Sequence, residues 1–104
     1  MKKTIDIPHF IKDLSAKASK IIIGQMNLDR NHNWRDVVME VWPHYTMDDI
    51  EIKFKEGKMT KVLQEMASSG KQTVDLLKIL IKLEKKNILI DLEDIYPSIR
   101  EFII

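Results

Sequence analysis

Three histidines are the first side chains to consider for chemistry, because imidazole is a common metal ligand and general base. They are His9, His32 and His44. No two of them stand four residues apart on one expected helix, and each lies at or near a turn. A zinc site needs three or four converging ligands, and the chain has no cysteine that could supply a thiolate. We therefore expect solvent-exposed histidines, no bound metal and no other cofactor.

Carboxylates and hydroxyls could also serve a catalytic site. Asp48, Asp49 and Glu51 are close in sequence, but paired catalytic carboxylates need a cleft that perturbs them. Acids at the start of a helix have a simpler explanation, since the helix dipole stabilises them there. Ser68 and Ser69 lie outside any Gly-x-Ser-x-Gly turn, and the sequence contains no P-loop. The sequence therefore indicates a protein that is not an enzyme and has no small-molecule substrate.

Charged side chains are unevenly distributed, although the net charge is only +1. Acids predominate between positions 31 and 56, whereas lysines predominate from 57 to 86 and in the first expected helix. Two surfaces of unlike charge on one small body favour head-to-tail association, with the acidic surface of one copy on the basic surface of the next. The alternative is that both surfaces are only solvated, because exposed charge pairs contribute little energy.

Some apolar side chains fall outside the expected core faces, namely Ile23, Met39 and Ile52. Exposed apolar residues beside charged ones are typical of protein interfaces. The candidate partner-binding residues on the acidic side are Asp36, Met39, Glu40, Asp48, Asp49, Glu51 and Ile52. The candidate residues on the basic side are Lys17, Lys20, Lys58 and Lys61.

The composition predicts an all-α fold, so helices must position these residues. A chain of 104 residues can close one hydrophobic core, so we expect a single domain over 1–104, with its helical bundle over roughly 10–96. Three glycines and three prolines are too few for a β-sandwich. The lack of cysteine suits a reducing cytoplasm. The sequence contains no run of about 18 apolar residues, so we expect no insertion into a membrane.

Capping signals predict where the helices begin and end. The expected N-caps are Ser15, Asn33, Thr46 and Thr73. Asp36 is placed to complete a capping box with Asn33, and Asn87 is expected to start the sixth helix. Pro43 should stop the second helix, Gly57 should interrupt the pattern after the third, and Gly70 should follow the fourth as its C′ residue.

Apolar residues at helical spacing predict the core faces of six short helices. The clearest stripe is Trp34, Val37, Val38, Val41 and Trp42. The other inward faces include Leu14, Ala18, Ile22 and Met26, then Met47, Ile50 and Phe54, then Met59, Val62, Leu63 and Met66, and finally Ile88, Leu92 and Ile95. The fifth helix is apolar almost all round, which is typical of the middle of a bundle. We expect a mostly antiparallel six-helix bundle with a short C-terminal tail helix packed on it.

Two segments resemble the death domains of the Toll and interleukin-1 receptor pathway. Asn33-Trp34-Arg35-Asp36-Val37-Val38 looks like the opening of that family's second helix, where a buried tryptophan begins the core. Thr73-Val74-Asp75-Leu76-Leu77 is similar to its fifth-helix signature Thr-Val-Gly-Asp-Leu-Leu, with the glycine absent. The resemblance implies a death-fold bundle, and a cytoplasmic adaptor that assembles innate immune signalling complexes by contacts with other death domains.

Residues 34–54 also fit the helix, short turn and helix of a helix-turn-helix DNA-binding domain, which is the alternative interpretation. Its second helix would bring Asp48, Asp49 and Glu51 towards the phosphates, and their repulsion argues against it. We therefore expect no nucleic-acid partner.

We predict that Trp34→Ala prevents stable folding, because Trp34 opens the clearest core stripe. Truncating an aromatic side chain in a core lowers the free energy of unfolding by about 3–5 kcal/mol, which is comparable to the whole stability of a small domain. Thermal unfolding followed by circular dichroism measures the effect. A variant that melts within a few degrees of the parent would show that Trp34 does not lie in the core.

Overall fold

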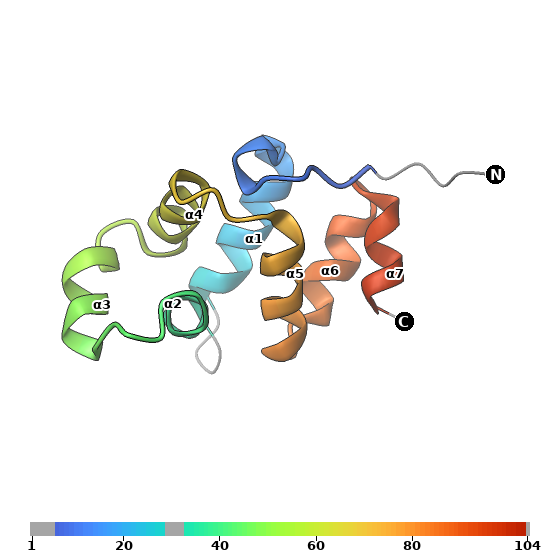
Figure 1. The fold of residues 1–104 in the computed structure, drawn as a ribbon. Helices are drawn as coiled ribbons and strands as arrows, with labels where there is room; N and C mark the ends of the chain where they lie inside the picture. The colour runs from blue at the N-terminus through green and yellow to red at the C-terminus, as the bar shows by residue number, and fades with distance from the viewer. Residues whose placement is uncertain (1–5, 29–32, 104) are drawn as a thin grey trace.

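The computed structural model describes residues 6–28 and 33–103, and these form only helices, turns and connections (Figure 1). The one strand-like feature among them is an isolated bridge between Phe10 and Gln72. The helices are α1 (Ala16–Leu28), α2 (Trp34–Val41), α3 (Met47–Phe54), α4 (Lys58–Ser68), α5 (Thr73–Lys82), α6 (Lys86–Glu93) and α7 (Arg100–Ile103). Two 3-10 turns, η1 (Ile11–Asp13) and η2 (Pro97–Ile99), flank the bundle. The expected all-α class is confirmed.

Capping boxes fix the starts of α2 and α3. The backbone N–H of Asn33 donates to the carboxylate of Asp36 at 3.1 Å, and the Asn33 side chain accepts a backbone N–H in return. Thr46 and Asp49 exchange the same two hydrogen bonds at 3.0 and 3.1 Å. Each box satisfies N–H groups that have no partner within the helix. The predicted caps at Asn33 and Thr46 are confirmed, and α2 ends just before Pro43 as expected.

The start of α5 differs from the prediction that Thr73 is its N-cap. The cap residue is Gln72, and Thr73 is the first residue of the helix. The N–H of Thr73 donates to the carbonyl of His9 at 3.0 Å, so a distant segment satisfies it. The Thr73 hydroxyl is buried and has no hydrogen-bond partner among the described residues. Similarly, α6 begins at Lys86, one residue before the expected Asn87.

A side chain of another helix caps α4. Its own N-cap position, Gly57, has no side chain and adopts a φ of 99°. The side-chain oxygen of Asn27, near the end of α1, accepts the backbone N–H of Met59 at 3.0 Å. The start of α4 is therefore attached to the end of α1.

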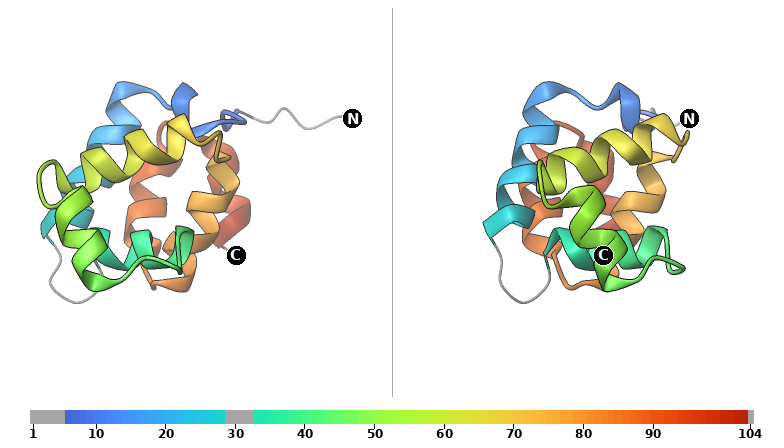
Figure 2. Two further views of the ribbon diagram at one scale, coloured as in Figure 1. Left: turned by 60° about the vertical axis from the view of Figure 1, so that its left-hand side comes forward. Right: turned by 90° about the vertical axis from the view of Figure 1, so that its left-hand side faces the viewer.

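The core lies where α1, α2, α4, α5 and α6 meet. α1 packs on α4 and α6, α2 packs on α4 and α5, and α5 packs on α6. α3 packs chiefly on α4 and lies at one end of the molecule, as Figures 1 and 2 show. The predicted inward residues that are buried are Ala18, Ile22, Met26, Trp34, Val37, Val38, Ile50, Phe54, Met59, Val62, Leu63, Met66, Leu76, Leu77, Leu80, Ile88 and Leu92.

Met47 and Ile23 do not lie where the apolar spacing predicts. Met47 is 54% exposed, because it occupies the first position of α3, one turn before Ile50 meets the core. Ile23 is half-buried and packs against the core, since α4 lies over that side of α1. Helical spacing alone does not show where along a helix the contact with the core ends, as at Met47. It also does not show how much of the helix circumference its neighbours cover, as at Ile23.

Three aromatic rings join α2 to α3. Trp42, directly after α2, stacks on Phe54 with ring centroids 5.7 Å apart and planes inclined by 22°. Tyr45 also stacks on Trp42, with ring centroids 5.8 Å apart. The connection between the two helices is thus held against the inner side of α3.

The C-terminal tail packs back on the bundle, as predicted. Tyr96 and Ile99 are buried, and η2 and α7 pack on α6. The Tyr96 hydroxyl accepts the backbone N–H of Ser15 at 2.9 Å, while the Ser15 hydroxyl caps α1 by accepting the N–H of Ala18 at 3.1 Å. The tail therefore fixes the start of α1.

Schellman motifs end both α4 and α5. After α4, the N–H of Gly70 donates to Ala67 and the next N–H reaches back to Met66, with Gly70 at a φ of 74°. After α5, Glu84 takes the same place at a φ of 61°. The predicted C′ role of Gly70 is confirmed. Glu84 adopts a backbone conformation that L-residues other than glycine disfavour.

We predict that Glu84→Gly raises the free energy of unfolding by about 0.5–1 kcal/mol. The left-handed conformation costs an L-residue about 1–2 kcal/mol, and part of this gain is offset by the greater freedom of glycine in the unfolded chain. Urea unfolding measures the change.

Gly70→Ala is the matched control at the equivalent position, since a Cβ there meets no atom within 4 Å. It should lower the free energy of unfolding by about 1 kcal/mol through backbone conformation alone. If both substitutions shift stability in the same direction, the left-handed conformation is not the cause.

Candidate interaction surfaces

The groups considered for chemistry do not converge in the described part of the chain. His9 and His44 are exposed, and His32 lies outside the described residues. Within residues 6–28 and 33–103, no three histidine or carboxylate side chains are placed to hold a metal ion. No described helix is long and apolar enough to cross a membrane.

Two of the candidate acids are engaged in capping their own helices. Asp36 and Asp49 accept the N–H of Asn33 and Thr46. The hydrogen bonds from Thr46 hold the pKa of Asp49 below its ordinary value, because they favour the charged carboxylate. These two acids have a structural role whether or not a partner binds.

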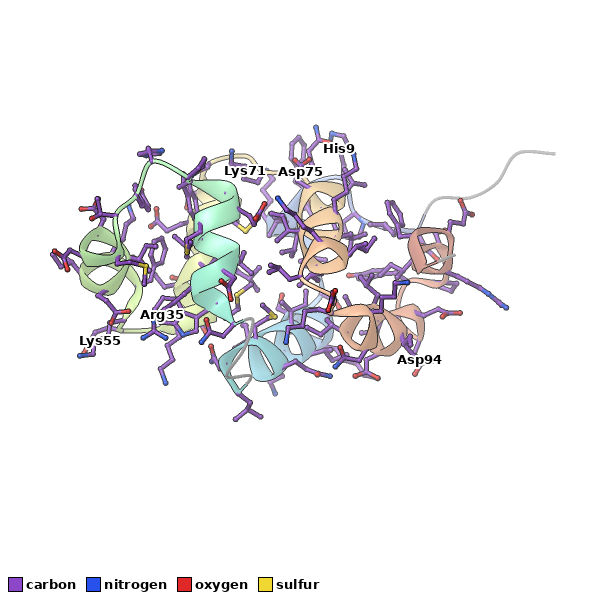
Figure 3. All side chains as sticks on the ribbon, turned by 90° about the horizontal axis from the view of Figure 1, so that it is seen from below. His9, Arg35, Lys55, Lys71, Asp75 and Asp94 are labelled. Carbon is purple, nitrogen blue, oxygen red and sulfur yellow. The ribbon has the colours of Figure 1, made fainter. Side chains whose placement is uncertain are left out.

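Two further acids pair with bases of the same chain. Nε of Arg35 lies 2.6 Å from the Glu51 carboxylate and joins α2 to α3; Figure 3 shows Arg35 between these helices. The hydrogen bond from Arg35 lowers the pKa of Glu51. Nζ of Lys82 on α5 lies 2.9 Å from the Glu40 carboxylate. Internal partners thus reduce the negative charge that this side of the molecule presents.

The outer side of α3 keeps the features expected of a contact surface. Ile52 is 84% exposed, and Asp48, four residues earlier on the same side of the helix, is exposed too. Met39 on α2 is 46% exposed. The prediction that Met39 and Ile52 lie outside the core is confirmed.

The four candidate lysines lie on two separate surfaces. Lys17 and Lys20 line a groove between α1 and α6. Lys61 lies on α4 within 3.5 Å of Glu65, which also pairs with Lys53 of α3 at 3.4 Å. Lys58 stands at the start of α4, where that helix meets the end of α1. The structure therefore places Lys58 and Lys61 on α4 and leaves Lys17 and Lys20 on the surface between α1 and α6.

The groove between α1 and α6 was not predicted from the sequence. Its further lining residues are Ile21, Gly24, Gln25, Leu28, Asp91, Asp94 and Ile95. One signal was present: Gly24 lies inside a helix, where glycine is unfavourable by about 1 kcal/mol relative to alanine. The pairing of α1 with α6, which brings the acids opposite the lysines, is a property of the folded chain.

Comparisons of this chain with models of protein families, with curated proteins and with solved structures find no match in any of the three.

We predict that Arg35 and Glu51 are coupled in a pH-dependent way. The pKa of Glu51 is lowered in the folded state, so the ion pair stabilises the fold above the ordinary value of 4.5 and is lost as the pH falls through the lower folded value. Glu51→Gln should therefore be less stable than the parent at pH 7, and the difference should shrink below pH 4.5.

Arg35→Gln removes the other partner and closes a double-mutant cycle. Unfolding measured at pH 7 and pH 3 should give a favourable coupling that is larger at pH 7 than at pH 3 and is weakened by salt. Equal coupling at both pH values would show that the ion pair does not hold α2 against α3.

Proposed function

We propose that this chain is a non-catalytic, cytoplasmic protein-interaction module of the death-domain type, which assembles signalling complexes of the Toll and interleukin-1 receptor pathway by contacts with other death domains. The observation that carries the proposal is the outer side of α3, where Ile52 is 84% exposed beside the carboxylate of Asp48. Exposed apolar side chains surrounded by charges are typical of partner surfaces.

The resemblance supports the same proposal. Asn33 and Trp34, where the second-helix motif begins, open α2 with a capping box and a buried ring. Leu76 and Leu77 of the fifth-helix motif are buried in α5. The missing glycine falls near the start of α5, where Thr73 is a helical residue with its hydroxyl buried. This departure makes the α4–α5 connection the part where contacts should differ most from those of the family.

The helix-turn-helix alternative has no comparable support. Asp48 and Asp49 are exposed in the first turn of α3, the turn that would have to approach the DNA. Phosphates repel such a surface. DNA binding is therefore not proposed.

Association should depend on the carboxylates of the acidic surface. We predict that Glu40→Lys with Glu51→Lys abolishes assembly, because like charges would then meet across a contact with a basic surface. Sedimentation velocity over a range of concentrations measures the mass, first of the chain alone and then mixed with death domains of the pathway.

The control must separate partner contacts from internal ones, because the double reversal also breaks the Arg35–Glu51 and Lys82–Glu40 pairs. Arg35→Gln with Lys82→Gln breaks the same two pairs but keeps both carboxylates, and it should assemble like the parent. If both double variants lose assembly equally, the internal pairs are responsible. If the double reversal assembles normally, the acidic surface makes no contact.

A further inference from the structure

A groove of about 640 Å³ lies between α1 and α6, and its two sides carry opposite charge. Lys17 and Lys20 form a lysine wall on α1, and Asp91 and Asp94 form an aspartate wall on α6. Charges of both signs at fixed positions can select a partner that carries the complementary pair.

Hydrogen bonds hold the α6 side of the groove in place. Nε2 of Gln25 donates to the Asp91 carboxylate at 2.7 Å, and Nδ2 of Asn87 donates to the side-chain oxygen of Gln25 at 2.9 Å. The polar side chains that join α1 to α6 are thus ordered by one another. A partner would meet a preformed surface, which reduces the entropy lost on binding.

Gly24 leaves the floor of the groove accessible, because it has no side chain. Ile21, Gly24 and Ile95 form this apolar floor, with Leu28 beside them at 83% exposure. A Cβ at Gly24 would meet no atom within 4 Å, so packing within the chain does not require glycine there. The helix is less stable by about 1 kcal/mol for it. Because Gly24 has no side chain, another molecule can approach the α1 backbone closely there.

We propose that this groove is the docking site for α3 of a second copy of the chain. The inference rests on the proposed function and names the acceptor surface. Asp48, Ile52 and Lys55 follow one another at four and three residues, so they form one stripe on the outer side of α3. Lys55 keeps helical backbone angles of −54° and −43°. The stripe presents an acid, an apolar side chain and a base in that order.

The spacing of the stripe matches the width of the groove. Seven residues separate Asp48 from Lys55, which is about 10 Å along a helix, and packed helices lie about 8–10 Å apart. An α3 helix laid across the groove therefore places Asp48 at the lysine wall and Lys55 at the aspartate wall. Ile52 then lies over the apolar floor, above Gly24.

The two surfaces are far apart on one molecule. In Figure 3, Lys55 lies at the α3 end and Asp94 lies at the α6 end. Each copy can therefore donate α3 to one neighbour and accept α3 from another. Such a heterologous contact builds an open chain unless its rotation closes a ring.

Two variants test the docking, each blocking one surface. Gly24→Leu fills the floor, and Ile52→Asp places a carboxylate where an apolar side chain is buried. Each alone should weaken self-association at least about tenfold, because the central apolar contact of an interface contributes most of its binding energy. Mixed together, they should form a 1:1 heterodimer that grows no further, because each retains the surface that the other has lost.

Ile90→Asp is the matched control, since Ile90 is an exposed apolar residue of α6 that does not line the groove. It should associate as the parent does, and circular dichroism checks that every variant is folded. A parent that stays monomeric, or a mixture without heterodimer, overturns the inference. If the parent associates and Gly24→Leu does too, the groove is not the acceptor, while the Glu40 and Glu51 reversal still tests the proposed function separately.

Discussion

The stacking of Trp42 on Phe54 is the contact on which the α3 surface depends. α3 also packs on α4, and two of its further attachments are the Arg35–Glu51 and Lys53–Glu65 ion pairs, whose side chains are partly exposed. Exposed pairs of this kind contribute little, whereas buried aromatic contacts combine a large apolar area with a preferred geometry. The orientation of everything on the outer side of α3 is therefore set by rings on its inner side.

The helix starts could be predicted where the signal is local. Asn33 with Asp36 acts within one turn of helix, and so does Thr46, so their roles follow from the sequence alone. Thr73 could not be assigned in this way. Its N–H donates to the carbonyl of His9, which lies 64 residues earlier in the sequence. A local sequence pattern carries no information about that contact.

The surfaces were less predictable than the core, for a related reason. Exposure of Met39 and Ile52 follows from their place on a helix, and it was predicted correctly. Which charges share a surface depends on how helices pack. Lys17 and Lys58 both lie in basic stretches of sequence, yet α1 turns Lys17 towards α6 while Lys58 starts α4. Equally, the partner of Glu40 on α5 is fixed by tertiary packing.

The cap that Asn27 provides for α4 has a consequence for how the domain folds. The first turn of α4 has a glycine at its own cap position and takes its side-chain acceptor from α1. An α4 helix formed before α1 is in place would lack this acceptor, so its amide protons should gain protection only when the two helices dock. Nucleation of the bundle is then a joint event of α1 and α4, and partial opening at one of them should expose the other to solvent exchange.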